Sequence, residues 1–452
     1  MESNLVKARA TIVWILAILV AFGAVWWIEK QSGKELIARR NAASAGAASP
    51  QLPDSTGIAA TPAPRALNEQ EKAWAAVAWR YFEENTNPET GLAPSVAGFQ
   101  GTTMWDTASY LLAVLSAHDL GLIEKRGFDL RIAKALVALE TMPLYGGQLP
   151  NKSYDVGSLD MTDYANQAAP QGVGWSAIDI GRLLVPLNTI VWQHSVHTPA
   201  VRRVLARWNT EQLARGGELF GMQHAAGAQP RATQEGRLGY EQYAARTFEL
   251  MGLDVEGAAD WRRHLRLVDV GGVQVCADAR DPKRFGAQNY VVSEPYALSG
   301  LEFGWTRSAR ECAWRVYRAQ EQRFRSTGVL TAVSEDHVDQ APYFVYNSVW
   351  SAGRAWATVN DKGEDAAPLR TLSTKAAFAW HALFRTDYTA QLVAKAATLQ
   401  EPGRGFQAGL YEEGGKPNRA LTANTNAVIL ESLAYIARGP ALQVHRPGER
   451  KP

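Results

Sequence analysis

The chain has 452 residues, a formal net charge of +2 and a hydrophobic content of 46%. A near-neutral balance without a long basic stretch in the globular part excludes nucleic acid as an expected partner. Two cysteines, Cys276 and Cys312, exclude a disulfide-rich scaffold, and neither their spacing nor the scattered histidines fits a metal site. We therefore expect no metal and no cofactor. Whether the two thiols pair or stay reduced is left open by the sequence.

Residues 10–28 read ATIVWILAILVAFGAVWWI, nineteen residues without a charge. This stretch is long enough to cross a bilayer as a helix, and Trp26 and Trp27 suit an interfacial belt. A cleavable signal peptide usually has a shorter apolar region that ends in small residues. The sequence therefore predicts an uncleaved transmembrane anchor over 10–28, with residues 1–9 in the cytoplasm.

The basic residues around this anchor and its sequence context indicate opposite orientations in the membrane. Two basic residues precede it and four follow it: Lys7, Arg9, Lys30, Lys34, Arg39 and Arg40. That count alone leaves the globular part in the cytoplasm. A short anchor followed by a spacer and an aromatic-rich domain is typical of envelope enzymes. By this analogy we expect a single-pass protein of the bacterial inner membrane, with the globular domain in the periplasm.

Composition divides the rest of the chain into three parts. Residues 29–67 are rich in Ala, Pro and Ser and are predicted to be a flexible linker. A folded domain is predicted over 68–439, with Asn68 as the N-cap of its first amphipathic helix. Residues 440–452 are predicted to be a disordered tail.

Within the domain, helical periodicity dominates. Six stretches begin with a polar or aromatic cluster and continue with small apolar residues; they start at Met104, Gly174, Gly239, Ser293, Tyr346 and Thr422. More amphipathic stretches lie between them, such as FDLRIAKALVAL and PAVRRVLARWNTEQLA. Alternating inner and outer helices predict an all-α fold, an (α/α)6 barrel or six-hairpin toroid. An irregular helical domain is the alternative, because no clear sequence repeat is visible.

A few short strands are expected beside the helices. The clearest is LRLVDVGGVQVCAD, residues 265–278, where Gly271 and Gly272 are predicted to form the turn of a hairpin.

Acidic residues recur at or near the helix starts. In a barrel of this kind the inner helices run parallel, so their first turns gather at one face. The candidate catalytic carboxylates are Glu241, Asp106, Asp179, Asp336 and Asp339. Two of them have a structural alternative: Asp106 fits an N-cap, and Asp179 forms a capping box with Ser176. Glu294 suits the positive end of a helix dipole.

Aromatic residues accompany these acids, and the two together suit sugar chemistry. Aromatic faces stack on pyranose rings, while two carboxyl groups divide the acid and base work. The candidate substrate-binding residues are Trp105, Tyr154, Trp175, Tyr240, Glu294, Tyr296, Glu335, His337, Tyr343, Tyr346 and Trp350. Several of them lie in residues 327–350, where acids and aromatics together predict a long ordered active-site loop.

Several stretches resemble the glucoamylase-like (α/α)6 domains, which include bacterial β-1,2-glucanases. TTMWDTASYLLAVLSAHDLGLI resembles the first helix of that group, and GWSAIDIGRLL resembles its Asp-Ser-Gly-Asn helix. GYEQYAARTFELMGLD is similar to a segment that places Glu241 on a glutamate of the family's cleft. The similarity spans roughly residues 75–438, and the closer match is an uncharacterised bacterial envelope family related to this group. Because Asn-Trp-Tyr-Asp has become NKSYD here, the resemblance does not imply β-1,2-glucan specificity.

The resemblance implies a membrane-anchored periplasmic glycoside hydrolase or transglycosylase that acts on an envelope or exopolysaccharide glucan. Glu241 is the expected general acid, with the base among the other candidate carboxylates. One alternative is a non-catalytic polysaccharide-binding protein associated with a glycan synthase. Another is a polysaccharide lyase that uses His337 with Tyr343 or Tyr346. The expected partners are a polysaccharide or oligosaccharide, the membrane through the N-terminal helix, and a polysaccharide synthase complex.

Overall fold

A computed structural model describes residues 52–225, 227–282 and 288–442. The predicted cytoplasmic segment 1–9, the anchor 10–28, the first part of the linker and most of the tail lie outside these residues. Within the described part of the chain, no helix is both long enough and apolar enough to span a bilayer.

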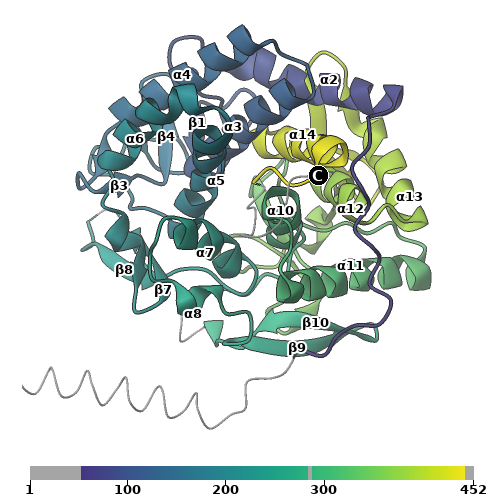
Figure 1. The fold of residues 1–452 in the computed structure, drawn as a ribbon. Coiled ribbons are helices and arrows are strands. Elements are labelled where there is room, and N and C mark those ends of the chain that lie inside the picture. The colour runs from purple at the N-terminus through teal and green to yellow at the C-terminus, as the bar shows by residue number, and fades with distance from the viewer. Residues whose placement is uncertain (1–51, 226, 283–287, 443–452) are drawn as a thin grey trace, which may run out of the picture. The chain divides into compact units, whose positions relative to one another are not determined.

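Six helices of the described residues surround the axis of the domain and pack against one another in chain order (Figure 1). They are α3 (Met104–Asp119), α5 (Ala177–Gln193), α7 (Tyr240–Leu250), α10 (Glu294–Leu298), α12 (Thr374–Phe384) and α14 (Ala423–Arg438). Because α14 packs against α3, the ring is closed. A π-helix, Ser299–Phe303, continues α10. In α3, 13 of 16 residues are buried, as expected for a helix that contacts neighbours on all sides.

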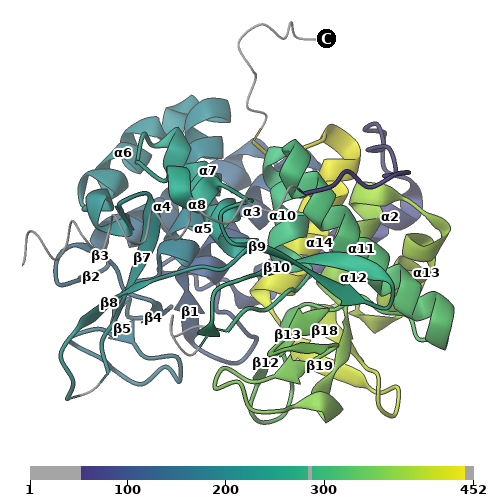
Figure 2. The same ribbon diagram turned by 90° about the horizontal axis from the view of Figure 1, so that it is seen from below.

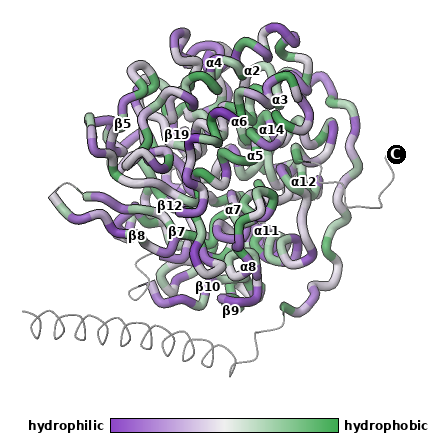
Figure 3. The backbone as a smooth tube through the Cα atoms, turned by 60° about the vertical axis from the view of Figure 1, so that its left-hand side comes forward, coloured by the Kyte–Doolittle hydropathy of each residue, from purple (hydrophilic) through white to green (hydrophobic). Residues whose placement is uncertain are grey.

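A second set of helices lies outside this ring (Figure 1). It consists of α2 (Glu69–Asn85), α4 (Lys125–Thr141), α6 (Thr198–Ala206), α8 (Glu256–Ala259), α11 (Arg307–Thr327) and α13 (Asp387–Ala396). Figure 3 shows a hydrophobic stretch in the inner helix α5. The hairpin of β7 (Glu218–Gln223) and β8 (Arg231–Gln234) projects from the domain, and β8 is its more hydrophilic strand. The predicted alternation of inner and outer helices therefore agrees with the structure.

One predicted inner helix is wrong. The stretch from Tyr346 forms short strands, β12 (Phe344–Asn347), β13 (Trp350–Ser351), β14 (Arg354–Ala355) and β15 (Thr358–Val359). Ala352 and Trp356 have positive φ angles of 50° and 58°, which a helix cannot accommodate. The inner helix of this part of the chain is α12, whose sequence TKAAFAWHALF was not predicted as one.

The structure also contains more strands than the few that were expected. They are β1 (Gly101–Thr103), β2 (Leu144–Tyr145), β3 (Leu149–Pro150), β4 (Ser153–Asp155), β5 (Met161–Thr162), β6 (Ala214–Arg215), β11 (Glu335–His337), β16 (Thr371–Ser373), β17 (Gln400–Glu401), β18 (Gly405–Tyr411) and β19 (Pro417–Leu421). Small antiparallel sheets join them: β1 with β4 and β5, β11 with β12 and β15, and β16 with β18. Figure 2 shows β1, β4, β5, β12, β18 and β19 at one end of the helices. Since β1, β16 and β19 lead into α3, α12 and α14, this is the end where inner helices begin.

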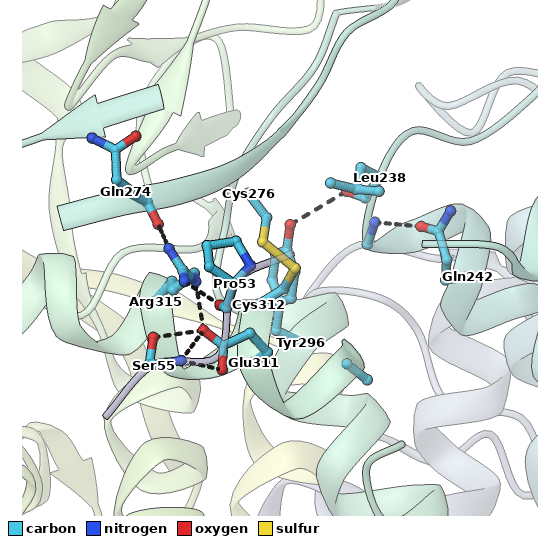
Figure 4. The surroundings of a disulfide bond; sticks show 12 residues. Pro53, Ser55, Leu238, Gln242, Gln274, Cys276, Tyr296, Glu311, Cys312 and Arg315 are labelled. Carbon is cyan, nitrogen blue, oxygen red and sulfur yellow. Dashed lines mark hydrogen bonds and ion pairs between the residues drawn. A yellow bond between two sulfur atoms is a disulfide. The ribbon is translucent and has the colours of Figure 1, made fainter. Parts of the chain in front are cut away.

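The predicted hairpin is confirmed. Strands β9 (Leu265–Val270) and β10 (Val273–Asp278) pair antiparallel, and both turn glycines have positive φ angles. β10 packs against α11. A disulfide between Cys276 and Cys312, whose Cα atoms are 5.6 Å apart, joins these two elements (Figure 4). The two thiols, whose state the sequence left open, are therefore paired.

Residues 52–67 form an extended strap that packs on the domain, although they were predicted to belong to the flexible linker. The backbone N–H and hydroxyl of Ser55 both donate to the carboxylate of Glu311, which lies next to Cys312 (Figure 4). Arg315 donates to the carbonyl oxygen of Pro53 at 2.7 Å. Hydrogen bonds to side chains of α11 thus hold this segment on the domain, so it is not a free linker.

Both ends of the helical region agree with the expected boundaries. Asn68 caps α2 in a reciprocal capping box with Glu71, as predicted. Gly439 follows α14 as its C-cap. Beyond it, the backbone N–H of Ala441 donates to Leu301 and the side chain of Leu442 is fully buried. The first residues of the predicted tail are therefore packed.

Candidate active site

At the end where the inner helices begin, several charged and aromatic side chains keep part of their surface exposed. These half-buried residues are Trp105, Lys152, Asp179, Glu235, Tyr240, Tyr290, His337 and Tyr346. Protein surrounds many of them closely enough to shift their pKa values. We call this set the recess. A surface hollow lined by Gly217, Glu249 and residues 253–257, among others, contains none of them.

Two carboxyl groups lie together at the start of α5. Ser176 caps this helix by accepting the N–H of Asp179 at 3.1 Å, which confirms the Ser176 half of the predicted capping box. The carboxylate of Glu235 accepts the N–H of Ala177 at 2.6 Å. Burial raises the pKa of Asp179 to about 7, and the charge of Glu235 adds to this shift. Burial also raises the pKa of Glu235, against the opposing charge of Lys152. Burial therefore favours the protonated form of Asp179 far more than in a solvent-exposed aspartate.

A second pair of acids comes from β11. Burial raises the pKa of Glu335 to about 7, and its carboxylate accepts the Ser334 hydroxyl at 2.9 Å. Burial raises the pKa of Asp336 well above its usual value. Asp336 accepts the Ser373 hydroxyl at 3.0 Å, and its carboxylate lies 3.8 Å from the ammonium group of Lys375. Both acids are almost fully buried, with Asp336 the more enclosed of the two.

Tyr346 connects the two groups of acids. Its ring stacks on that of Tyr290, with centroids 3.8 Å apart and planes 5° from parallel. Burial raises the pKa of the Tyr346 hydroxyl, and the charges of Tyr290, Glu335 and Asp179 raise it further. The Tyr346 hydroxyl therefore lies within electrostatic range of both Asp179 and Glu335. Acids from α5 and from β11 thus act on one hydroxyl group, although 156 positions separate them (335 − 179).

Trp105 and Tyr240 form an aromatic pair in the recess. Their rings meet edge to face, with centroids 5.7 Å apart. The indole N–H of Trp105 donates to Glu294 at 3.0 Å. Asn424 donates to the same carboxylate at 2.7 Å, and Lys375 forms an ion pair with it. Glu294 is buried, so it orients Trp105 and does not present itself to solvent.

Glu241, the predicted general acid, lies outside the recess. Its side chain is buried, with 1% of the residue exposed. Arg280 donates to one carboxylate oxygen at 2.6 Å and Gln234 donates to the other at 3.0 Å. Burial raises the pKa of Glu241 to about 7. Because both oxygens are engaged away from solvent, this structure gives Glu241 no access to a glycosidic bond.

Asp106 is also held within the protein. Its carboxylate accepts the hydroxyls of Ser95 at 2.6 Å and Thr103 at 2.8 Å, and the residue is 4% exposed. The N-cap of α3 is Thr103, which accepts the N–H of Asp106 at 3.1 Å. Asp106 is therefore a buried first-turn acid, and neither the predicted cap nor a carboxylate in the recess.

Three of the predicted aromatic contacts belong to the core. Tyr154 and Tyr296 have no exposed surface, and Tyr154 donates its hydroxyl to the carbonyl of Pro143 at 2.7 Å. Trp175 is 5% exposed and donates its indole N–H to Phe220. A ring without a free face cannot stack on a sugar, so we withdraw these three residues as substrate contacts.

Two further candidates lie on exposed loops. Asp339 is exposed and accepts hydrogen bonds from the Tyr411 hydroxyl at 2.6 Å and the Arg419 N–H at 2.9 Å. Tyr343 is 63% exposed. The structure places Asp339 against β18 and β19, and no contact connects it with Asp179 or Glu335.

His337 and Trp350 remain predicted substrate contacts, since both are half-buried. Burial lowers the pKa of His337, which leaves it neutral near pH 7. Among the described residues, no group of three or more His, Cys, Asp or Glu side chains is arranged to hold a metal ion.

The sequence analysis missed Glu235, Lys152 and Tyr290. Glu235 lies in the loop TQEGRLG before α7, six residues from the acid that was singled out. Its N–H pairs with Leu219 and its carboxylate with α5. An acid in a loop carries no periodic signal, so only the fold shows where it points.

The fold is shared with solved structures of glucoamylase-like proteins and glucanases. The endo-β-1,2-glucanase of Chitinophaga pinensis is 11% identical, covers 83% of this chain and 94% of its own, and gives a TM-score of 0.59. That of Talaromyces funiculosus, solved with sophorose, is 13% identical, with 82% and 84% covered and a TM-score of 0.55. A glucoamylase-like protein of Bacteroides caccae is 11% identical, with 82% and 93% covered and a TM-score of 0.56. These likenesses define a glucoamylase-like helical fold, as the sequence resemblance implied.

The family of the chain is shown by its sequence. Residues 73–439 match the family described as Protein of unknown function (DUF3131), and the chain belongs to it. No curated protein sequence matches the chain.

Proposed function

We propose that this protein is a glycoside hydrolase of the (α/α)6 class that cleaves a glucan. The observation that carries the proposal is the recess, which contains Asp179 and Glu235 together with Trp105 and Tyr240, and the buried Glu335, whose charge acts on Tyr346 of the recess. A shared fold alone does not assign an activity, because one fold supports many chemistries. Glycoside hydrolysis requires a protonated carboxyl group as the acid and an ionised carboxylate as the base, and the raised pKa of Asp179 suits the first of these roles.

In the proposed mechanism, Asp179 is the general acid and Glu335 the general base. Asp179 protonates the glycosidic oxygen as the bond to the anomeric carbon breaks. Glu335 takes a proton from the water that attacks this carbon, so one water is consumed and a new reducing end is formed. Trp105 and Tyr240 stack on the sugar ring and hold it against the acids. A transglycosylase would use the same groups with a sugar hydroxyl in place of water.

We further propose that the enzyme is anchored in the inner membrane by residues 10–28 and acts in the periplasm on an envelope or exopolysaccharide glucan. The disulfide between Cys276 and Cys312 supports this location, because such bonds persist in oxidising compartments such as the periplasm. A neighbouring glycan synthase is the partner that this location suggests.

The test is an assay of the full-length chain on linear β-1,2-, β-1,3- and β-1,4-glucans, with new reducing ends as the measured product. We expect one of these glucans to be cleaved, and Asp179→Asn to lower kcat by about 100-fold or more, as loss of a general acid does. Asp339→Asn is the matched control and should retain full activity, because Asp339 lies on a separate loop. Binding without products would contradict hydrolysis and favour the carbohydrate-binding alternative. Unsaturated products that absorb ultraviolet light would indicate a lyase.

A further inference from the structure

A group of charged residues is buried in the middle of the helix ring, below the recess. Arg182 of α5 has no exposed surface and lies near three carboxylates on other inner elements. Its guanidinium nitrogens are 3.5 Å from Glu294, 3.8 Å from Glu302 and 3.4 Å from Glu431. The four side chains are at most 3% exposed. We call them the axial cluster.

The axial cluster is costly to bury and therefore needs its partners. A buried ion is stable only when it is paired and hydrogen-bonded. Burial raises the pKa of Glu302 and of Glu431, and the charge of Glu302 adds to the shift at Glu431. A proton on one of these carboxyl groups reduces the negative charge around Arg182. Tyr243 donates its hydroxyl to Glu302 as well. Removal of the guanidinium would therefore leave Glu302 and Glu431 without the counter-charge of Arg182, whereas Glu294 would keep Lys375.

The axial cluster contacts Trp105 in two ways. The guanidinium carbon of Arg182 lies 4.4 Å from the centre of the indole ring, within the range of a cation–π contact. The indole N–H donates to Glu294. Asn424 connects the two, because it accepts from Arg182 at 3.1 Å and donates to Glu294 at 2.7 Å. One contact fixes the tilt of the ring and the other fixes its rotation.

We propose that Arg182 is a positioning residue that holds the indole of Trp105 at the angle at which it receives a sugar ring. The assignment of Trp105 as a sugar contact rests on the proposed function, whereas the positioning itself does not. An aromatic ring that is already ordered loses less side-chain entropy on binding, so its affinity for a ligand is higher. The planar guanidinium is required for this role, because the ammonium group of lysine is a point charge that does not stack in the same way.

The experiment uses the full-length chain labelled with 5-fluorotryptophan. Loss of one fluorine signal in Trp105→Phe identifies the signal of Trp105. We expect this signal to shift by more than its line width and to broaden in Arg182→Met and in Arg182→Lys, while most other tryptophan signals stay in place. Arg182→Lys keeps the positive charge and is the variant to use if Arg182→Met does not fold.

The matched control is Arg315→Met. Arg315 is also buried and ion-paired, to Glu311 at 2.6 Å, but it lies on α11 and makes no recorded contact with Trp105. It should leave the Trp105 signal unchanged. An unchanged signal in a folded Arg182 variant would overturn the proposal, and so would an equal change in the control.

Kinetics with the glucan that the wild-type chain cleaves provide the second measurement. We expect Arg182→Lys to raise KM roughly tenfold and to change kcat far less, as loss of a cation–π contact and its hydrogen bonds would do. A loss in kcat alone would contradict a role in substrate positioning. If the wild-type chain cleaves none of the glucans while the fluorine signal moves as expected, the proposed function fails and the positioning of Trp105 stands.

Discussion

The starts of α5 and α7 carry acids of the same kind in very different surroundings. Asp179 lies in the first turn of α5 and Glu241 in the first turn of α7, and burial raises the pKa of each to about 7. Asp179 is half-buried beside another carboxyl group, Glu235. Glu241 is fully buried and is held by Arg280. The position of an acid at a helix start therefore does not show whether it is catalytic. Its burial and its ion-pair partner are better evidence.

The largest expected effect separates the two acids by activity. Asp179→Asn should lower kcat about 100-fold or more, because a positioned general acid contributes at least this factor. Glu241→Gln should change kcat less than about fivefold, since the amide keeps the shape of a residue that does not reach solvent. Steady-state kinetics on the same glucan compares them. If Glu241→Gln abolishes turnover and Asp179→Asn does not, the assignment of the general acid must be reversed.

A smaller effect separates them by stability. Glu241→Gln removes one of the carboxylates around the buried guanidinium of Arg280, while Asp278 remains as its partner. We expect a loss of about 1–3 kcal/mol in the free energy of unfolding, below the usual cost of leaving a buried charge unpaired. Asp179→Asn should cause no loss at pH 8. The pKa of Asp179 is raised in the folded state, so its ionised form opposes folding above its usual pKa of 3.8, and the neutral amide removes that opposition.

Urea unfolding followed by circular dichroism measures both variants. Equal losses of stability in the two would show that Asp179 is as firmly paired as Glu241, which would contradict the difference between the two helix starts.

The smallest effect concerns pH. A general acid works in its protonated form and a general base in its ionised form, so activity should peak near pH 7 and fall on the alkaline side as Asp179 loses its proton. Glu235→Gln removes a neighbouring negative charge. Loss of that charge favours ionised Asp179 and lowers its pKa, so the alkaline limb of the kcat/KM profile should move to lower pH by up to about one unit. Lys152, which faces the same groups, stays in place. A limb that moves upward or remains fixed would show that Asp179 is not the group that titrates.

The sequence correctly predicted helix caps and the hairpin turn, because these features depend on residues that are close together in the chain. Asn68 and Ser176 cap helices where the sequence expected caps, and Gly271 and Gly272 turn the hairpin. The stretch from Tyr346 was misread because its small and aromatic residues resemble those of an inner helix. Its positive φ angles depend on turns that composition alone does not reveal.

The candidate site was less predictable, because its decisive contacts join distant positions. Arg280 lies 39 residues beyond Glu241 and decides that this acid is paired. Glu235 is aimed at α5 by a loop of another sheet, and the ring contact between Arg182 and Trp105 links two different helices. Periodicity in the sequence does not reveal such pairs. The sequence therefore predicted acids and aromatic residues in the site, but not which of them face solvent and which are held by a distant partner.

The strap over 52–67 has a mechanical consequence. A pull on the chain ahead of Leu52 meets Glu311 and Arg315 first, and Cys312 on the same helix passes the force through a covalent bond to β10. The load would run along the outer layer and bypass Asp179 and Glu335. A tether attached at this point can therefore be stretched while the geometry needed for sugar cleavage stays undisturbed.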